Sequence, residues 1–223
     1  MSDEINVIIH GFGGSTKEIM YLKEYLDGNG LAIQTITLAG HGGTKKDLHK
    51  TSHKNWLESA EAEIAKLSTQ YGKINLIGFS MGGLISANIA LSQKINKLVF
   101  VNTPIYFWNL KLIAKRVFTD LRSGGNENIA YFRKSVGGVS IKSAIEFLRI
   151  LSKTKKILNT LQTQSLILQC TEDETVHYKS AEYLKSKLKN TRLKYYEGGH
   201  HQIFLKAIDL RDEFCGEILN FLR

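Results

Sequence analysis

A serine flanked by glycines is the residue in this sequence whose setting most clearly suits chemistry. The stretch Gly78–Gly83 reads Gly-Phe-Ser-Met-Gly-Gly and contains the pattern Gly-x-Ser-x-Gly. The apolar run 73–77 before it predicts a buried strand, and the run 84–91 after it predicts a helix. A turn this tight strains the serine backbone and leaves the hydroxyl standing free, and its glycines let strand and helix approach closely. Ser80 is therefore the candidate nucleophile.

A histidine near the end of the chain is the candidate base. A serine hydroxyl is a poor nucleophile until a base within hydrogen-bond reach takes its proton. In a doubly wound sheet, the groups of a site come from loops at the carboxyl ends of the strands. The segment Gly198-Gly199-His200-His201 follows the last predicted strand, and its glycines allow the loop to fold back toward Ser80. We predict His200 as the base because it directly follows the glycine pair, and His201 is the alternative.

Three adjacent carboxylates follow the preceding predicted strand, at Glu172, Asp173 and Glu174. One of them would hold a single tautomer of the histidine and stabilise its cation during turnover. The other two would be solvated or would cap the helix expected to begin near residue 178 or 179. Composition alone leaves the choice among the three open.

Two backbone amides are candidates to stabilise an oxyanion. Met81 begins the helix behind Ser80, where free N–H groups coincide with the positive end of the helix dipole. The glycine-rich loop His10–Gly14 follows the first predicted strand, and Phe12 in that loop is the second predicted donor. The ring of Phe12 would also form a wall of the substrate pocket. A phosphate-binding role for this loop is disfavoured, because the loop lacks both GxGxxG and GK[ST].

Strand and helix patterns alternate along the chain, and these elements must position the candidate residues. The alternation predicts an α/β fold: a mostly parallel sheet with helices on both faces. Six strands are expected, at 5–9, 32–38, 73–77, 97–102, 164–169 and 192–196. Helical spacing is found at 19–26, 56–67, 84–91 and 209–222. Ser15 and Glu18 have the spacing of a capping box before the first helix, and residues 39–50 are expected to form a polar loop.

One interval interrupts the alternation and defines the expected domain organisation. Residues 104–161 contain the only proline, no strand pattern and many aromatic residues. An insertion of this length is too long for an ordinary loop, so we predict a small helical lid over the mouth of the sheet. The core would then comprise residues 1–103 and 162–223. Tyr106 and Trp108 in the lid are predicted, with Phe12, to contact the substrate.

Composition narrows the range of partners. The chain has 223 residues and a formal net charge of +9, but its lysines are scattered and no nucleic-acid-binding motif accompanies them. We therefore expect no nucleic-acid partner. The start, Met1-Ser2-Asp3-Glu4, is not a secretory signal, and no apolar stretch reaches the roughly 18 residues of a membrane span. We expect a cytoplasmic protein without stable membrane insertion.

The cysteines and histidines do not indicate a metal or a disulfide. Cys170 and Cys215 are expected to be free thiols, as is usual in the cytoplasm. The seven histidines form no HExxH motif, and the cysteines form no CxxC motif. We predict that the chemistry needs neither a metal nor a cofactor.

The chain order Ser80, Asp173, His200 is that of the α/β-hydrolase triad. From about residue 5 to residue 222, the chain resembles compact α/β-hydrolases of the esterase and lipase type, especially bacterial carboxylesterases and monoacylglycerol lipases. The matching segments are His10–Gly14, Gly40–Gly42, Gly78–Gly83, Asp173–Val176 and Gly199-His200. The resemblance favours Asp173 over Glu172 as the acid. It also implies oxyanion amides at Phe12 and Met81 and a helical lid at 104–161.

The resemblance implies a serine hydrolase of carboxylic esters. The expected substrates are small-molecule short- to medium-chain acyl esters or monoglycerides, cleaved through an acyl-enzyme on Ser80. The alternatives are a thioesterase, an aryl-ester hydrolase or an amide hydrolase on the same triad, or a non-catalytic binding protein with this fold. We expect the chain to depart from many relatives in lacking antiparallel strands before its first strand, in having a sheet of about six strands, and in its doubled histidine, His200-His201.

Overall fold

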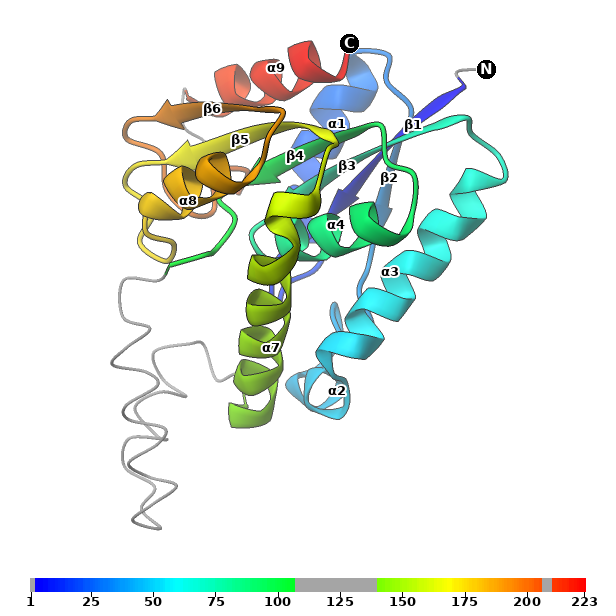
Figure 1. The fold of residues 1–223 in the computed structure, drawn as a ribbon, viewed down its shortest axis with the longest axis vertical. Helices are drawn as coiled ribbons and strands as arrows, with labels where there is room; N and C mark the ends of the chain where they lie inside the picture. Colours follow the sequence, from blue (N-terminus) through cyan, green and yellow to red (C-terminus); the bar gives the residue numbers. More distant parts are fainter. Residues whose placement is uncertain (1–2, 107–139, 206–209) are drawn as a thin grey trace.

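A six-stranded sheet forms the centre of the molecule (Figure 1). The computed structural model describes residues 3–106, 140–205 and 210–223. The strands lie in the order β2-β1-β3-β4-β5-β6, and every neighbouring pair is parallel. Their bounds are β1 Glu4–Ile9, β2 Ile33–Ile36, β3 Lys73–Phe79, β4 Lys97–Val101, β5 Gln164–Cys170 and β6 Thr191–Tyr196. The predicted α/β fold is confirmed.

Helices cover both faces of the sheet, as the sequence pattern predicts. The described helices are η1 Thr16–Ile19, α1 Met20–Gly28, α2 Lys45–Lys50, α3 His53–Ser68, α4 Met81–Ser92, α7 Ile141–Ile157, η2 Leu158–Thr160, α8 Lys179–Lys187 and α9 Leu210–Leu222. Helices α1 and α9 pack on one face (Figure 1). Helices α3, α4 and α8 pack on the other face, and α7 joins the same apolar cluster.

The central strands are buried on both faces, which explains why they read as continuous apolar runs. Val7 and Leu76 point toward α3 and α4, whereas Ile8 and Ile77 point toward α1 and α9. Helix α4 is also apolar around its circumference, and its residues 81–89 are all buried. The candidate nucleophile therefore lies between two deeply buried elements, β3 and α4.

The strand order reverses beside β1, and this reversal locates the site. The chain runs from β1 to its neighbour β2 and then returns to β3 on the other side of β1. Strands β1 and β3 end together, with Ile9 opposite Gly78. Their following loops diverge at that point, which creates the crevice in which open α/β sheets bind ligands. Both the loop His10–Gly14 and Ser80 lie at this crevice.

Two local predictions differ from the structure. The segment 39–50 contains the helix α2, which begins with a capping box between Thr44 and Asp47. The capping box predicted for Ser15 and Glu18 is wrong: the Ser15 hydroxyl accepts a hydrogen bond from the Lys17 amide. The carboxylate of Glu18 is engaged elsewhere, because it bonds to the loop after β1.

Part of the predicted lid belongs to the main apolar core. Helix α7 buries Phe147, Ile150 and Leu151 in the cluster that also contains the apolar faces of α3 and α4. Polar groups also join α7 to the start of α3: the carboxylate of Glu146 accepts hydrogen bonds from the His53 amide (3.1 Å) and from the His53 Nδ1 (2.5 Å). Residues 107–139, including Trp108, lie outside the described residues, so the lid itself stays a prediction.

The described helices include none that combines the length and the apolarity needed to cross a membrane.

Candidate active site

The backbone at Ser80 has the strained conformation that its sequence setting predicts. Its φ of 51° and ψ of −120° place it in a region that non-glycine residues rarely adopt. The Ser80 amide still donates to the Val101 carbonyl at 2.8 Å, which continues the pairing of β3 with β4. A Cβ at Gly78 would lie 2.3 Å from the Gly83 nitrogen, and one at Gly82 would lie 2.1 Å from the Ile9 carbonyl oxygen. The two glycines are therefore required by close backbone contacts.

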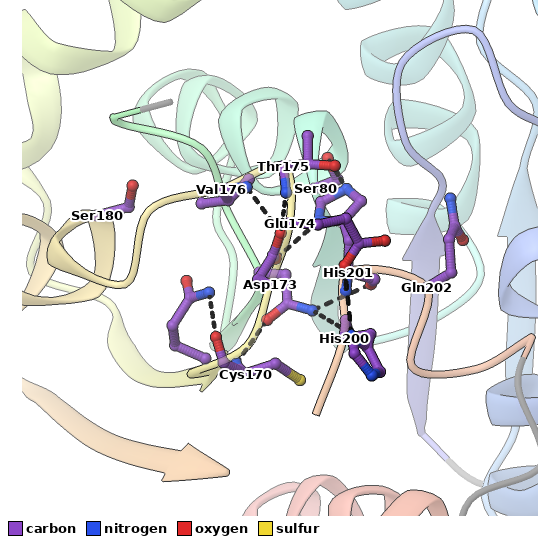
Figure 2. A network of polar contacts seen from close by, with 12 residues as sticks. Ser80, Cys170, Asp173, Glu174, Thr175, Val176, Ser180, His200, His201 and Gln202 are labelled. Carbon is purple, nitrogen blue, oxygen red and sulfur yellow. Dashed lines mark hydrogen bonds and ion pairs between the residues drawn. The ribbon is translucent and has the colours of Figure 1, made fainter. Parts of the chain in front are cut away.

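A histidine and an aspartate are aligned with the Ser80 hydroxyl (Figure 2). The Nε2 of His201 lies 3.1 Å from the Ser80 Oγ, and its Nδ1 lies 2.7 Å from the Asp173 Oδ2. All three residues are buried. Because an ionised carboxylate can only accept, Nδ1 carries the imidazole proton and Nε2 is left to accept from the hydroxyl. This is the hydrogen-bond order that activates a serine.

The structure corrects the predicted choice of histidine. His200 does not contact Ser80; its side chain is exposed, and its Nδ1 lies 3.6 Å from the Glu174 Oε2. The reason lies in the backbone of the loop after β6. Gly199 packs so tightly against Cys170 that a Cβ would lie 2.6 Å from the sulfur. The loop is therefore fixed against the end of β5, and the next two side chains point to opposite sides, His200 outward and His201 into the crevice.

Among the three carboxylates, Asp173 is the one brought to the histidine. Its Oδ1 accepts hydrogen bonds from the amides of Thr175 (2.8 Å) and Val176 (2.7 Å), which leaves Oδ2 for His201. Glu174 is exposed and accepts from the His201 amide at 3.2 Å, so it supports the base through the main chain. Glu172 is exposed, and only its backbone joins the loop after β6.

The two predicted oxyanion segments meet beside Ser80. Met81 is the first residue of α4, so its amide belongs to the helix turn that has no intrahelical acceptor. The loop after β1 passes close to the serine: a Cβ at Gly11 would lie 3.4 Å from the Ser80 Cβ. The next amide in that loop is that of Phe12. This arrangement is compatible with the predicted pair of donors at Phe12 and Met81.

The ring of Phe12 belongs to an aromatic cluster. Its centroid lies 5.0 Å from that of Phe147 on α7, 5.6 Å from that of Trp56 on α3 and 6.3 Å from that of His41. Phe12 is half-buried, whereas Trp56 and Phe147 are buried. Phe12 therefore gives the region beside the oxyanion loop an apolar surface, and the buried rings behind it hold it in place.

Tyr106 packs between α7 and α8: the Lys155 Nζ lies 4.9 Å from the centre of its ring. Its ring packs edge-on against Tyr183 of α8 at 5.6 Å, and its backbone bonds to the Ser180 hydroxyl. It lines an open recess of about 510 Å³ with residues of α8 and the turn before it, including His177 and Lys179. The predicted contact of Tyr106 with substrate stays a prediction.

Two buried histidines support the loops around the crevice. His10 donates from Nδ1 to the Gly11 carbonyl and accepts at Nε2 from the Leu38 amide, and burial lowers its pKa. Burial and the neighbouring His10 together lower the pKa of His41 to about 4. The two rings lie 5.1 Å apart. Both are neutral at pH 7, so they add no cation beside the oxyanion loop.

Glu18 belongs to the site, although its spacing from Ser15 predicts a helix cap. Its carboxylate accepts from the Gly11 amide at 3.2 Å and from the Gln202 side chain at 3.3 Å. Burial raises its pKa, while the hydrogen bonds from Gln202 and Gly11 and the proximity of His201 oppose that rise. Glu18 thus joins the loop after β1 to the residue that follows His201. The spacing to Ser15 indicated only a helix cap, because Gln202 is 184 positions away.

Among the described residues, no group of three or more His, Cys, Asp or Glu side chains is arranged to hold a metal ion. Cys170 and Cys215 are buried free thiols, and burial raises the pKa of each to about 12.

Known proteins resemble this chain over nearly its whole length. The sequence profile of the alpha/beta hydrolase fold family matches residues 7–120, just over half of the chain. A carboxylesterase of Bacillus subtilis (strain 168) is 21% identical over 230 residues, covering 99% of this chain and 94% of that protein. A thermostable monoacylglycerol lipase of Bacillus sp. (strain H-257) is 23% identical over 181 residues, covering 76% and 70%. A solved structure from a study of LipS and LipT, two metagenome-derived lipolytic enzymes, superposes with a TM-score of 0.82, 19% identity and coverage of 100% and 94%.

Proposed function

Because this chain belongs to the alpha/beta hydrolase fold family, we propose that it is a serine hydrolase that cleaves carboxylic esters through an acyl-enzyme on Ser80. The observation that carries the proposal is the continuous hydrogen-bonded chain from Ser80 through His201 to Asp173, with distances of 3.1 and 2.7 Å. The carboxylesterase and the monoacylglycerol lipase among its relatives support the same reaction class.

In the first half of the proposed reaction, the Ser80 Oγ attacks the ester carbonyl while its proton passes to the His201 Nε2. Asp173 accepts from the His201 Nδ1 and stabilises the imidazolium that forms. The negative charge on the former carbonyl oxygen is stabilised by the amides of Met81 and Phe12. When the tetrahedral intermediate collapses, the ester C–O bond breaks and the imidazolium protonates the leaving alcohol.

In the second half, a water molecule attacks the acyl-enzyme. His201 takes the water proton as the new C–O bond forms, and it returns this proton to Ser80 when the acid product leaves. The enzyme ends in its starting protonation state, so no cofactor is consumed.

The proposed substrates carry a single acyl chain of short to medium length, as simple esters or monoglycerides. The half-buried ring of Phe12, which packs on the buried rings of Trp56 and Phe147, suits an acyl chain better than a charged group. The names of the carboxylesterase and the monoacylglycerol lipase relatives agree with such substrates.

Replacement of Ser80 tests the proposal. We expect Ser80→Ala to lower kcat for a p-nitrophenyl ester roughly a million-fold, because the triad acts as a unit. A fluorophosphonate probe should label the wild-type serine but not the variant. Ser86→Ala is the matched control: Ser86 is buried on α4, the helix that follows Ser80, and its hydroxyl has no hydrogen-bond partner in the structure. This variant should keep full activity.

Full activity of Ser80→Ala would end the proposal. The same assay with p-nitrophenyl esters from acetate to palmitate, a monoglyceride and a triglyceride tests the substrate class. A clear optimum on long-chain triglyceride would contradict the proposed chain length and leave the mechanism standing.

A further inference from the structure

We infer that Asn102 is a positioning residue that holds the loop of the base and the loop of the acid in a fixed relation; the inference rests on the proposed function. Asn102 directly follows β4, the strand that lies between β3 and β5 in the sheet. Its neighbours at the same edge of the sheet are therefore the turn that carries Ser80 and the loop that carries Asp173.

The backbone of Asn102 is adapted to this place. Asn102 is fully buried and has a φ of 45°. In the described part of the chain, Ser80 is the other non-glycine residue with a positive φ. Asparagine tolerates this region better than most residues. Its amide donates to the Leu168 carbonyl at 3.0 Å, so the turn still follows the edge of β5.

The carboxamide of Asn102 joins two loops at once. Its Oδ1 accepts from the amide of Cys170, the last residue of β5, at 2.9 Å. Its Nδ2 donates to the carbonyls of His201 at 3.1 Å and His200 at 3.3 Å. Figure 2 shows Cys170 and the two histidines around this part of the network. A carboxamide is suited to the task because it offers a donor and an acceptor in one rigid plane.

These bonds bear directly on the alignment of the triad. Asp173 is three residues after Cys170, and His201 is held through its own carbonyl, so Asn102 connects both ends of the His201–Asp173 hydrogen bond without touching it. Two glycines, Gly198 and Gly199, directly precede the histidines in the loop of the base, and Gly198 has a φ of 74°. Glycines make the loop adaptable, and a displacement of about 1 Å can cost about a hundredfold in rate.

Two variants separate positioning from simple structural support. Asn102→Gly keeps the positive φ and removes all three side-chain hydrogen bonds. Asn102→Asp keeps the size and the acceptor for Cys170, but an ionised carboxylate cannot donate to the carbonyls of the base loop. Asn88→Ala is the matched control, since Asn88 is also buried and bonds to the Leu84 carbonyl and the Thr154 hydroxyl.

We expect both Asn102 variants to lower kcat about a hundredfold per folded molecule, with KM changed by less than about threefold. Folded protein is quantified by urea denaturation, so that a loss of stability is not counted as a loss of rate. Asn88→Ala should lower the free energy of unfolding and leave kcat unchanged.

Wild-type kcat in folded Asn102→Gly or in folded Asn102→Asp, with only stability reduced, would overturn the inference. If Asn102→Gly does not fold, the isosteric Asn102→Asp decides alone. A retained activity of Ser80→Ala would instead refute the proposed function, so the two failures are distinguishable.

Discussion

At the scale of single residues, the two adjacent histidines have different surroundings and different roles. His201 is buried between a hydroxyl and a carboxylate, whereas the His200 side chain is 38% exposed and lies 3.6 Å from the Glu174 carboxylate. What His200 contributes to the site is its carbonyl, which accepts from Asn102. The chemistry of a base requires alignment as well as residue type, so only one of the two imidazoles can act.

We expect His201→Ala to lower kcat on a p-nitrophenyl ester roughly a million-fold, because removal of one triad member disables the unit. His200→Ala is its control, and it should stay within about threefold of the wild type because the backbone carbonyl is kept. Initial rates at saturating substrate measure both. The assignment of the base would have to be reversed if His200→Ala were the inactive variant.

At the scale of elements, the site depends on how closely α4 approaches β1. Gly82 faces the carbonyl of Ile9 at the end of β1, and the loop that carries Phe12 begins just beyond it. The same contact therefore sets the distance between the two oxyanion segments. Glu18 also holds the loop after β1 in place, because its carboxylate accepts a hydrogen bond from the Gly11 amide.

We expect Gly82→Ala to lower the free energy of unfolding by about 2 to 3 kcal/mol, because a methyl group would be forced against backbone atoms. Its kcat should fall as well, since α4 must move away from the loop after β1. Gly28→Ala at the end of α1 is the control: a Cβ there meets nothing within 4 Å, and we expect stabilisation of about 0.5 kcal/mol. Urea denaturation and ester hydrolysis measure both variants, and equal stabilities would show that α4 can shift without cost.

At the scale of the whole molecule, the fold keeps ionisable groups neutral beneath the site. His41 is packed among His10, Phe12 and Trp56, and its pKa falls from 6.5 to about 4. Between these two pH values the unfolded chain binds more protons at His41 than the folded chain does. The contribution of neutral His41 to the free energy of unfolding is therefore fully present above pH 6.5 and is lost as the pH falls toward 4.

We expect the unfolding free energy to decrease by about 3 kcal/mol over this window through His41 alone. In His41→Asn, whose amide can still donate to the Ala39 carbonyl, the decrease should be correspondingly smaller. Urea denaturation at several pH values between 4 and 7 measures the difference. An unchanged pH dependence in the variant would contradict the assignment to His41.

Several features could be predicted from the sequence because their causes are local. The strands are continuous apolar runs, and Ser80 lies in a turn whose glycines are dictated by contacts within a few residues or with the adjacent strand. Asp173 precedes the amides that orient it by two and three positions. Such short-range patterns specify the class of fold and the kind of chemistry.

Other features depend on contacts between distant parts of the chain. Glu18 has the spacing of a helix cap, yet it bonds to Gln202, and Asn102 looks like an ordinary strand end, yet it joins two loops. The choice of His201 over His200 follows from the direction in which each side chain points, in a loop that packs against Cys170 at Gly199. The amino-acid sequence by itself determined which residue types could act and at which strand ends. Only the tertiary structure decided which of them meet, because a hydrogen bond requires alignment within tenths of an ångström that spacing along the chain does not encode.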